Sequence, residues 1–121
     1  MNSVCRRRVF AMTAAVGVFV TWYFNIRFML ETGGFSPTGF VMASYANDAS
    51  TSISNDLLVA VFTFLFWSFT EARRLGMKHW WLYVVATFTI AVAFAFPLFM
   101  YMRERALPLP PQEQRREAAR R

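Results

Sequence analysis

Residues 9–26 read VFAMTAAVGVFVTWYFNI and contain no charged side chain. An α-helix needs about 20 mainly apolar residues to cross the hydrocarbon core of a bilayer, so this stretch predicts a membrane-spanning helix. The arginines at positions 6–8 precede it, as basic residues precede the apolar part of a secretory signal peptide. The stretch exceeds the roughly 7–15 apolar residues of such a peptide, and no A-x-A cleavage pattern follows it. We therefore interpret it as a helix that the protein retains.

Two more uncharged, mainly apolar runs follow. Residues 57–69 would span about 20 Å as a helix, which is short of a hydrocarbon core of about 30 Å. The helix must therefore extend over its polar flanks, from residue 52 to residue 74, which places Asp56 one turn inside it. Residues 80–102 are long enough to span unaided. Pro97 predicts a kink in that third helix, because proline offers no N–H to the residue one turn earlier.

These runs predict an all-α, integral membrane protein with three transmembrane helices. Between the first and second helices, Ser36 and Pro37 have the order of an N-cap and a first helical residue. They predict a short helix that lies at the membrane interface. We divide the chain into a basic N-terminus at 1–8, a three-helix transmembrane domain at 9–105, and a Pro-rich, then basic, C-terminal tail at 106–121.

The basic residues indicate how the chain is oriented. Arginines precede the first run, residues 31–55 contain no Lys or Arg, and residues 71–79 contain three of them. Because cytoplasmic loops are enriched in Lys and Arg, this distribution places the N-terminus in the cytoplasm. Three spans then place the C-terminal tail outside, although residues 103–121 carry six arginines. The tail is the segment on which the three-span topology and the charge rule disagree.

The chain offers few side chains for catalysis or metal binding. It has one cysteine, Cys5, and one histidine, His79, so a thiolate or imidazole metal site would lack ligands. No charged residue lies at the centre of a run, where a proton relay or ion pathway would need one. Asp56 and Glu71 would lie about 22 Å apart on one helix, too far for a two-carboxylate active site. We therefore expect no enzymatic activity, no cofactor and no metal.

Charged and amide side chains gather at the expected outer ends of the first two helices. Arg27 ends the first helix and Asp56 begins the second, at the same depth in an antiparallel pair. A carboxylate inside a membrane helix is costly unless it is paired, so we expect Arg27 to pair with Asp56. Asn25, Asn47 and Asn55 would complete the cluster. We interpret it as a structural clasp; the alternatives are a site for a ligand headgroup, or side chains that reach separately to water.

Two further patterns concern helix ends and helix packing. Glu71 and Arg74 are three residues apart at the inner loop, a spacing that allows an ion pair within the helix. Small residues recur at every fourth position on the first and third helices, which favours close contact between membrane helices. We predict that these helices pack along two stripes, formed by Thr13, Gly17 and Thr21 and by Thr87, Ala91 and Ala95.

Three longer stretches carry a family resemblance. They are YAN at 45–47 with DLLV at 56–59, EARRLGM at 71–77, and FPLFMYMRE at 96–104. In this order they resemble a bacterial membrane family catalogued as domain of unknown function 2834. The resemblance covers about residues 10–105 and implies a small multi-span protein, without implying an activity. It points to a set of six positions: Asn47, Asp56, Glu71, Arg74, Pro97 and Tyr101.

The sequence departs from this family in three places, one of which is a Ser/Thr-rich run at 50–54 in place of more apolar residues. Asp48 stands where members often carry a basic residue, and the arginine-rich tail lies beyond the family region. These departures put a shared outer-side site in doubt. They also suggest that the tail is an addition particular to this protein.

These observations favour a small, non-catalytic accessory subunit of a larger membrane protein complex, stabilising or assembling it through helix packing and a basic tail. Expected partners are other membrane protein subunits and membrane lipids, including anionic ones, in the bacterial cytoplasmic (inner) membrane. Nucleic acid is not expected, because the net charge of +6 forms no basic surface interleaved with exposed aromatics. The alternative is a lipid- or isoprenoid-binding small transporter or membrane enzyme that acts as an oligomer.

Overall fold

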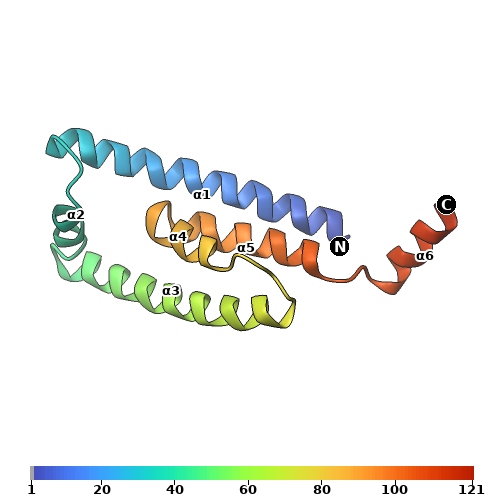
Figure 1. The fold of residues 1–121 in the computed structure, drawn as a ribbon. Coiled ribbons are helices and arrows are strands. Elements are labelled where there is room, and N and C mark those ends of the chain that lie inside the picture. The colour runs from blue at the N-terminus through green and yellow to red at the C-terminus, as the bar shows by residue number, and fades with distance from the viewer. Residues whose placement is uncertain (1) are drawn as a thin grey trace.

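The computed structural model describes residues 2–121, and every regular element in that range is an α-helix (Figure 1). The all-α prediction is therefore confirmed for the described residues. In chain order the helices are α1 (Ser3–Thr32), α2 (Pro37–Ser44), α3 (Asp48–Arg74), α4 (Trp81–Thr89), α5 (Val92–Ala106) and α6 (Pro111–Arg120).

The two long helices, α1 and α3, form the frame of the molecule. They contain 30 and 27 residues, and their most apolar windows have mean hydropathies of 1.6 and 1.5. At 1.5 Å per residue they are about 45 and 40 Å long, so both have the length and composition to cross a membrane. Only 6% and 17% of these windows are buried within the chain. They are therefore not the covered core helices of a globular domain.

Polar caps define the short helix α2 and the start of α3. Ser36 accepts a hydrogen bond from the Gly39 amide at 3.1 Å, so the predicted N-cap and Pro37 do begin a helix. Asn47 and Ser50 form a reciprocal capping box at the start of α3. This cap starts α3 at Asp48, one turn before the expected residue 52, because it satisfies the helix's first amides.

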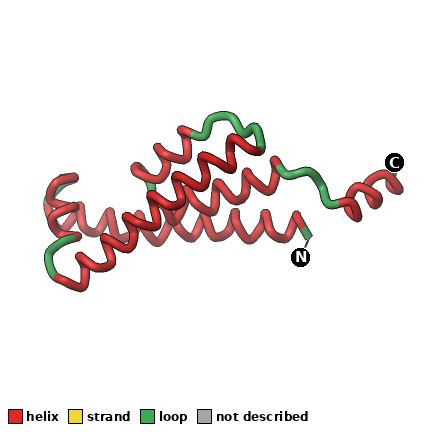
Figure 2. Tube along the Cα trace, turned by 90° about the horizontal axis from the view of Figure 1, so that it is seen from below, coloured by secondary structure: helices red, strands yellow, loops and turns green. Residues whose placement is uncertain are grey.

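Residues 80–102 do not form one continuous helix, so the prediction of a third spanning helix there is wrong. The chain forms α4, breaks at Ile90 and Ala91, and returns as α5 (Figures 1 and 2). Ala91 has the extended torsions φ 170° and ψ 156°. Four of the six residues at 87–92 are β-branched, which lowers helix propensity at this point. The helix continues through Pro97, so the change of direction lies at the break.

The pair α4–α5 is a hairpin whose two arms are each too short to span. They contain 9 and 15 residues. This corresponds to about 14 and 22 Å against a hydrocarbon core of about 30 Å. Figures 1 and 2 show the consequence: both termini and the loop after α3 lie at one end, and α2 lies at the other. The structure thus brings the tail to the same end as the N-terminus, which corrects the three-span expectation.

An aromatic core joins the hairpin to α3. Phe99 of α5 is fully buried, and its ring lies 5.2–5.9 Å, edge to face, from those of Phe64, Trp67 and Tyr83. Edge-to-face pairs add stabilisation beyond the area that they bury. The core therefore lies between the C-terminal half of α3 and the hairpin, and α1 covers the opposite side of α5.

The contact between α1 and α5 depends on the absence of a side chain at Gly17. A Cβ built there would lie 2.2 Å from the Ala93 carbonyl oxygen. That carbonyl is the one that Pro97, four residues later, cannot bond, because proline has no N–H. Gly17 therefore allows the backbone of α1 to approach the first turn of α5 directly.

Candidate functional site

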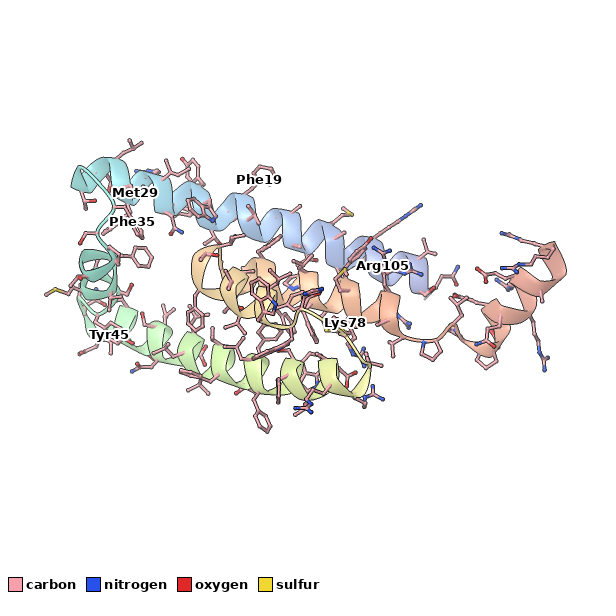
Figure 3. All side chains as sticks on the ribbon, in the orientation of Figure 1. Phe19, Met29, Phe35, Tyr45, Lys78 and Arg105 are labelled. Atoms are coloured by element: carbon pink, nitrogen blue, oxygen red, sulfur yellow. The ribbon has the colours of Figure 1, made fainter. Side chains whose placement is uncertain are left out.

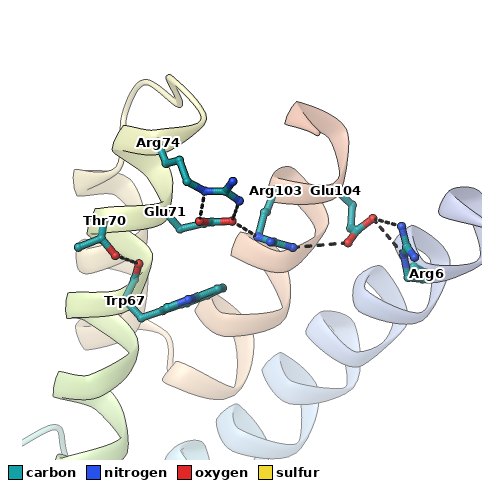
Figure 4. A network of polar contacts seen from close by, with 7 residues as sticks. All are labelled: Arg6, Trp67, Thr70, Glu71, Arg74, Arg103 and Glu104. Atoms are coloured by element: carbon teal, nitrogen blue, oxygen red, sulfur yellow. Dashed lines mark hydrogen bonds and ion pairs between the residues drawn. The ribbon is translucent and has the colours of Figure 1, made fainter. Parts of the chain in front are cut away.

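A chain of ion pairs links the ends of three helices at the terminus-bearing end of the molecule (Figure 4). Glu71, at the end of α3, accepts hydrogen bonds from Arg74 at 2.7 and 2.8 Å. It also accepts one from Arg103 of α5 at 2.6 Å. The ion pair expected between Glu71 and Arg74 thus forms, and Arg103 from another helix adds a second arginine to the same carboxylate.

The chain continues through Glu104 to α1. Glu104 lies 3.0 Å from Arg6 and 3.7 Å from Arg103. The guanidinium of Arg103 also lies 5.9 Å from the ring centroid of Trp67, within cation–π range. Arg103 therefore stands between the two carboxylates and against an aromatic face of α3.

Burial makes these pairs structurally important. The carboxylate side chains of Glu71 and Glu104 are 10% and 6% exposed, whereas Arg74 is 61% exposed. Breaking a buried pair by removing one partner is strongly destabilising, because it leaves an uncompensated charge. Each carboxylate here contacts two guanidinium groups. This arrangement fixes the ends of α1, α3 and α5 at one level.

The same end also holds a contact between the N-terminal region and the tail. Glu113 of α6 accepts hydrogen bonds from the hydroxyl and the amide of Ser3, at 2.8 and 3.3 Å. The Ser3 hydroxyl, its amide and the nearby arginines at positions 6 and 7 hold the pKa of Glu113 below its usual value. Burial opposes that shift without reversing it. The contact places α6 next to the start of α1.

The expected polar clasp at the opposite end does not form. Arg27 pairs with Glu31, one turn later on α1, at 3.2 Å. It does not pair with Asp56, which is exposed. Asn47 serves as the α3 cap, and Asn55 accepts a hydrogen bond at 3.3 Å from Tyr45. A local pair replaces the clasp, because Arg27 has a carboxylate four residues later on its own helix.

The small-residue stripes contribute unequally to packing. Gly17 lies against Ala93 in the α1–α5 contact, whereas Ala95 is fully buried in the core between α3 and the hairpin. Thr13 is exposed, and its hydroxyl donates to the Val9 carbonyl of its own helix. The remaining three residues of the predicted stripes line a cavity: Thr21, Thr87 and Ala91.

That cavity, of about 630 Å³, occupies the half of the molecule that the short hairpin does not fill. Its walls are α1, the two α3 residues Leu57 and Val61, and the tip of the hairpin at 87–93. Phe35 and Phe40 close it at the α2 end; Figure 3 labels Phe35 and Met29 there. The lining is mainly apolar and aromatic and contains no charged residue. This volume lies within the roughly 300–1,000 Å³ of small-molecule sites.

Sequence reasoning missed the residues that define both features. Arg6, Arg103 and Glu104 were not paired, because three spans put the end of the third helix on the opposite side of the membrane. The arginines of the tail were the available signal, since they conflicted with that topology. Trp22 lies inside the uncharged run at 9–26, where no local pattern distinguishes it, although it lines the cavity. Within residues 2–121 no group of three His, Cys, Asp or Glu side chains is placed to hold a metal ion.

The architecture defines a class of small all-helical proteins with two long apolar helices and a half-length helical hairpin packed between them. Residues 9–105 match the family described as Protein of unknown function DUF2834, and the chain belongs to that family. The resemblance of the three sequence stretches is thereby confirmed. Comparison with curated proteins and with solved structures finds no match.

Proposed function

We propose that this chain is a small, non-catalytic accessory subunit of a larger membrane protein complex in the bacterial cytoplasmic membrane. In this proposal α1 and α3 cross the bilayer, and the α4–α5 hairpin enters and leaves on one side. Every Lys and Arg except Arg27 belongs to the terminus-bearing end. The charge rule therefore supports placing that end in the cytoplasm, and the former conflict over the tail disappears.

Cysteine labelling tests this topology. Cys5 is native and exposed, and it lies at the terminus-bearing end. Two single-cysteine variants in a Cys5→Ser background, Gly34→Cys and Ala118→Cys, report on the α1–α2 connection and on the tail. In intact cells an impermeant maleimide should label position 34 only; positions 5 and 118 should react after the membrane is opened. Labelling of position 118 in intact cells would instead support three spans.

One observation carries the subunit role: an outward aromatic stripe on α3 that the chain itself does not cover. Phe62 and Phe66, one turn apart, are 64% and 74% exposed, and Val59 extends the stripe at 67%. Aromatic residues are enriched at protein interfaces. Lipid chains would cover leucine equally well, so an aromatic stripe favours a specific protein partner. Phe19 of α1, labelled in Figure 3, points away from the bundle in the same manner.

Replacing the aromatic residues by leucine distinguishes a stripe that binds a protein partner from a stripe that only contacts lipid. In mild detergent the tagged chain should purify with other membrane subunits in fixed stoichiometry. The double variant Phe62→Leu/Phe66→Leu should lose those subunits while its own thermal unfolding temperature stays unchanged. Migration of the wild-type protein as a lone 14.0 kDa protomer or a homo-oligomer would overturn the proposal.

A second candidate function is supported by the cavity. A lipid- or isoprenoid-binding role, as a small transporter or membrane enzyme acting as an oligomer, needs a space for the ligand, and the cavity provides one. The headgroup site once expected at Arg27, Asn47 and Asp56 is not part of it, because none of the three lines the cavity. In this candidate function the ligand is held between α1, α3 and the tip of the hairpin.

A further inference from the structure

The cavity has a lining that restricts the chemistry of its ligand. Its wall carries aromatic rings from four elements or connections, and no Lys, Arg, Asp or Glu. A charged headgroup would have no counter-ion there, and burying an unpaired charge is strongly unfavourable. The lining therefore selects an uncharged molecule. Because the surrounding helices α1 and α3 have membrane-spanning composition, that molecule would enter from the bilayer.

The polar groups of the wall include hydrogen-bond donors as well as acceptors, because the last carbonyls of α4 also lie on it. Asn25 and Trp22 contribute an amide and an indole N–H, and α5 begins at Val92 on the wall. Among the first amides of α5, those of Phe94 and Ala95 bond the Ala91 carbonyl, so the amides of Val92 and Ala93 are the ones that add donors. The hydroxyls of Thr87 and Thr89, by contrast, already donate to carbonyls of their own helix. An uncharged hydrogen-bond acceptor such as a carbonyl oxygen matches the side-chain donors of Asn25 and Trp22.

The aromatic part of the wall favours a flat ring. Trp22, Phe28 and Phe88 lie on it, together with Phe35 and Phe40, and the rings of Phe28 and Phe40 meet edge to face at 5.4 Å. Aromatic side chains pair with flat π-systems in offset or edge-on geometry. An acyl chain alone would use neither the rings nor the donors. Both features together fit a ring that bears carbonyl groups and is attached to a hydrocarbon chain.

We propose that this cavity is a binding site for a lipid-soluble quinone, with the ring against Trp22 and a ring carbonyl accepting from Asn25. The inference concerns binding only and includes no redox step. It rests on the second function proposed above, ligand binding, and does not depend on the subunit role. The site exists because the hairpin turns back at Ile90, leaving the space between α1 and α3 open.

Tryptophan fluorescence provides the test, because quinones quench nearby indoles. The full-length protein in nanodiscs is titrated with decylubiquinone and, in a parallel arm, with dibrominated dioleoylglycerol, an uncharged lipid that also quenches. Saturable quenching by the quinone that disappears in Trp22→Phe supports the proposal. Saturable quenching by the glycerolipid alone leaves ligand binding in place and overturns the quinone assignment. Saturable quenching by neither compound overturns both.

Two substitutions on α3 provide a matched pair. Val61→Phe fills the cavity from a lining position, and Val59→Phe adds the same ring on the outward face. Quenching should be lost in the first variant and retained in the second. Asn25→Leu keeps the size of the side chain and removes a donor, so quinone affinity should fall about five-fold. Equal quenching in all three variants would place the quinone outside the cavity.

Discussion

The close approach of α1 and α5 leads to a prediction about Gly17→Ala. In an exposed helix this change normally stabilises by about 1 kcal/mol, because glycine is a poor helix former. Here the new Cβ would lie 2.2 Å from a backbone oxygen, where ordinary contact begins at 3.4 Å. The helices must therefore separate by about 1.2 Å locally, since a carbonyl cannot rotate away as a side chain can. The expected sign is thus reversed from that of an exposed helix.

The magnitude follows from two opposing effects. Overpacking a well-packed contact costs about 1–3 kcal/mol, and the gain in helix propensity offsets about 1 kcal/mol of it. We expect a net destabilisation of about 1 kcal/mol, seen as a lower thermal unfolding temperature in detergent by near-UV circular dichroism. Ala15→Leu, which enlarges an exposed residue on the same helix at little cost in helix propensity, is the control and should leave the unfolding temperature nearly unchanged. A Gly17→Ala protein as stable as wild type, or more stable, would refute the packing of α5 against α1.

Three further predictions concern the polar contacts. Glu104→Gln weakens the link between α1 and α5, and the free energy of unfolding should fall by about 2 kcal/mol; a change below about 0.5 kcal/mol would contradict the ion-pair chain. Ser68→Ala removes the acceptor of the Trp80 indole, 3.0 Å away, and should destabilise by about 1–3 kcal/mol. Thr70→Ala should be nearly neutral, because that hydroxyl only bonds its own helix; equal losses in these two variants would refute a specific role for the indole bond. The pKa of Glu113 is lowered in the folded state, so its contact with the start of α1 stabilises α6 above the usual carboxyl pKa. That contribution should be lost as the pH falls from the usual carboxyl pKa through the lowered pKa of the folded state, and label distances between the first turn of α1 and α6 should then lengthen. Distances that stay constant would argue against the contact.

Local signals in the sequence were sufficient for the helices and several of their ends. The uncharged run at 9–26 predicted α1, and Ser36 with Pro37 predicted the start of α2. Arg74 was the expected last residue of α3 and is its last residue. These features depend on neighbouring residues, which a sequence displays directly. The aromatic contacts of Phe99 depend on how separate helices meet, and no local pattern indicates them.

The hairpin could not be predicted from apolarity and length. A uniformly apolar stretch such as residues 80–102 reads the same whether it crosses the bilayer or reverses within it. The β-branched residues around the break lower helix propensity without specifying a reversal. The stronger signal was the charge distribution, because a returning hairpin is the topology that brings the tail arginines to the side of Arg73 and Arg74.

The ion-pair chain and the cavity are two consequences of this one reversal. Eleven residues separate Arg6 from Gly17 on α1, and eleven separate Ala93 from Glu104 on α5. The two contacts, Arg6 with Glu104 and Gly17 with Ala93, therefore stay in register along antiparallel helices. Over about 16 Å the hairpin covers one half of α1 and leaves the other half as cavity wall. A straight third span would move Glu104 away from Arg6 and would leave Glu71 with Arg74 as its single arginine partner. It would also fill the cavity.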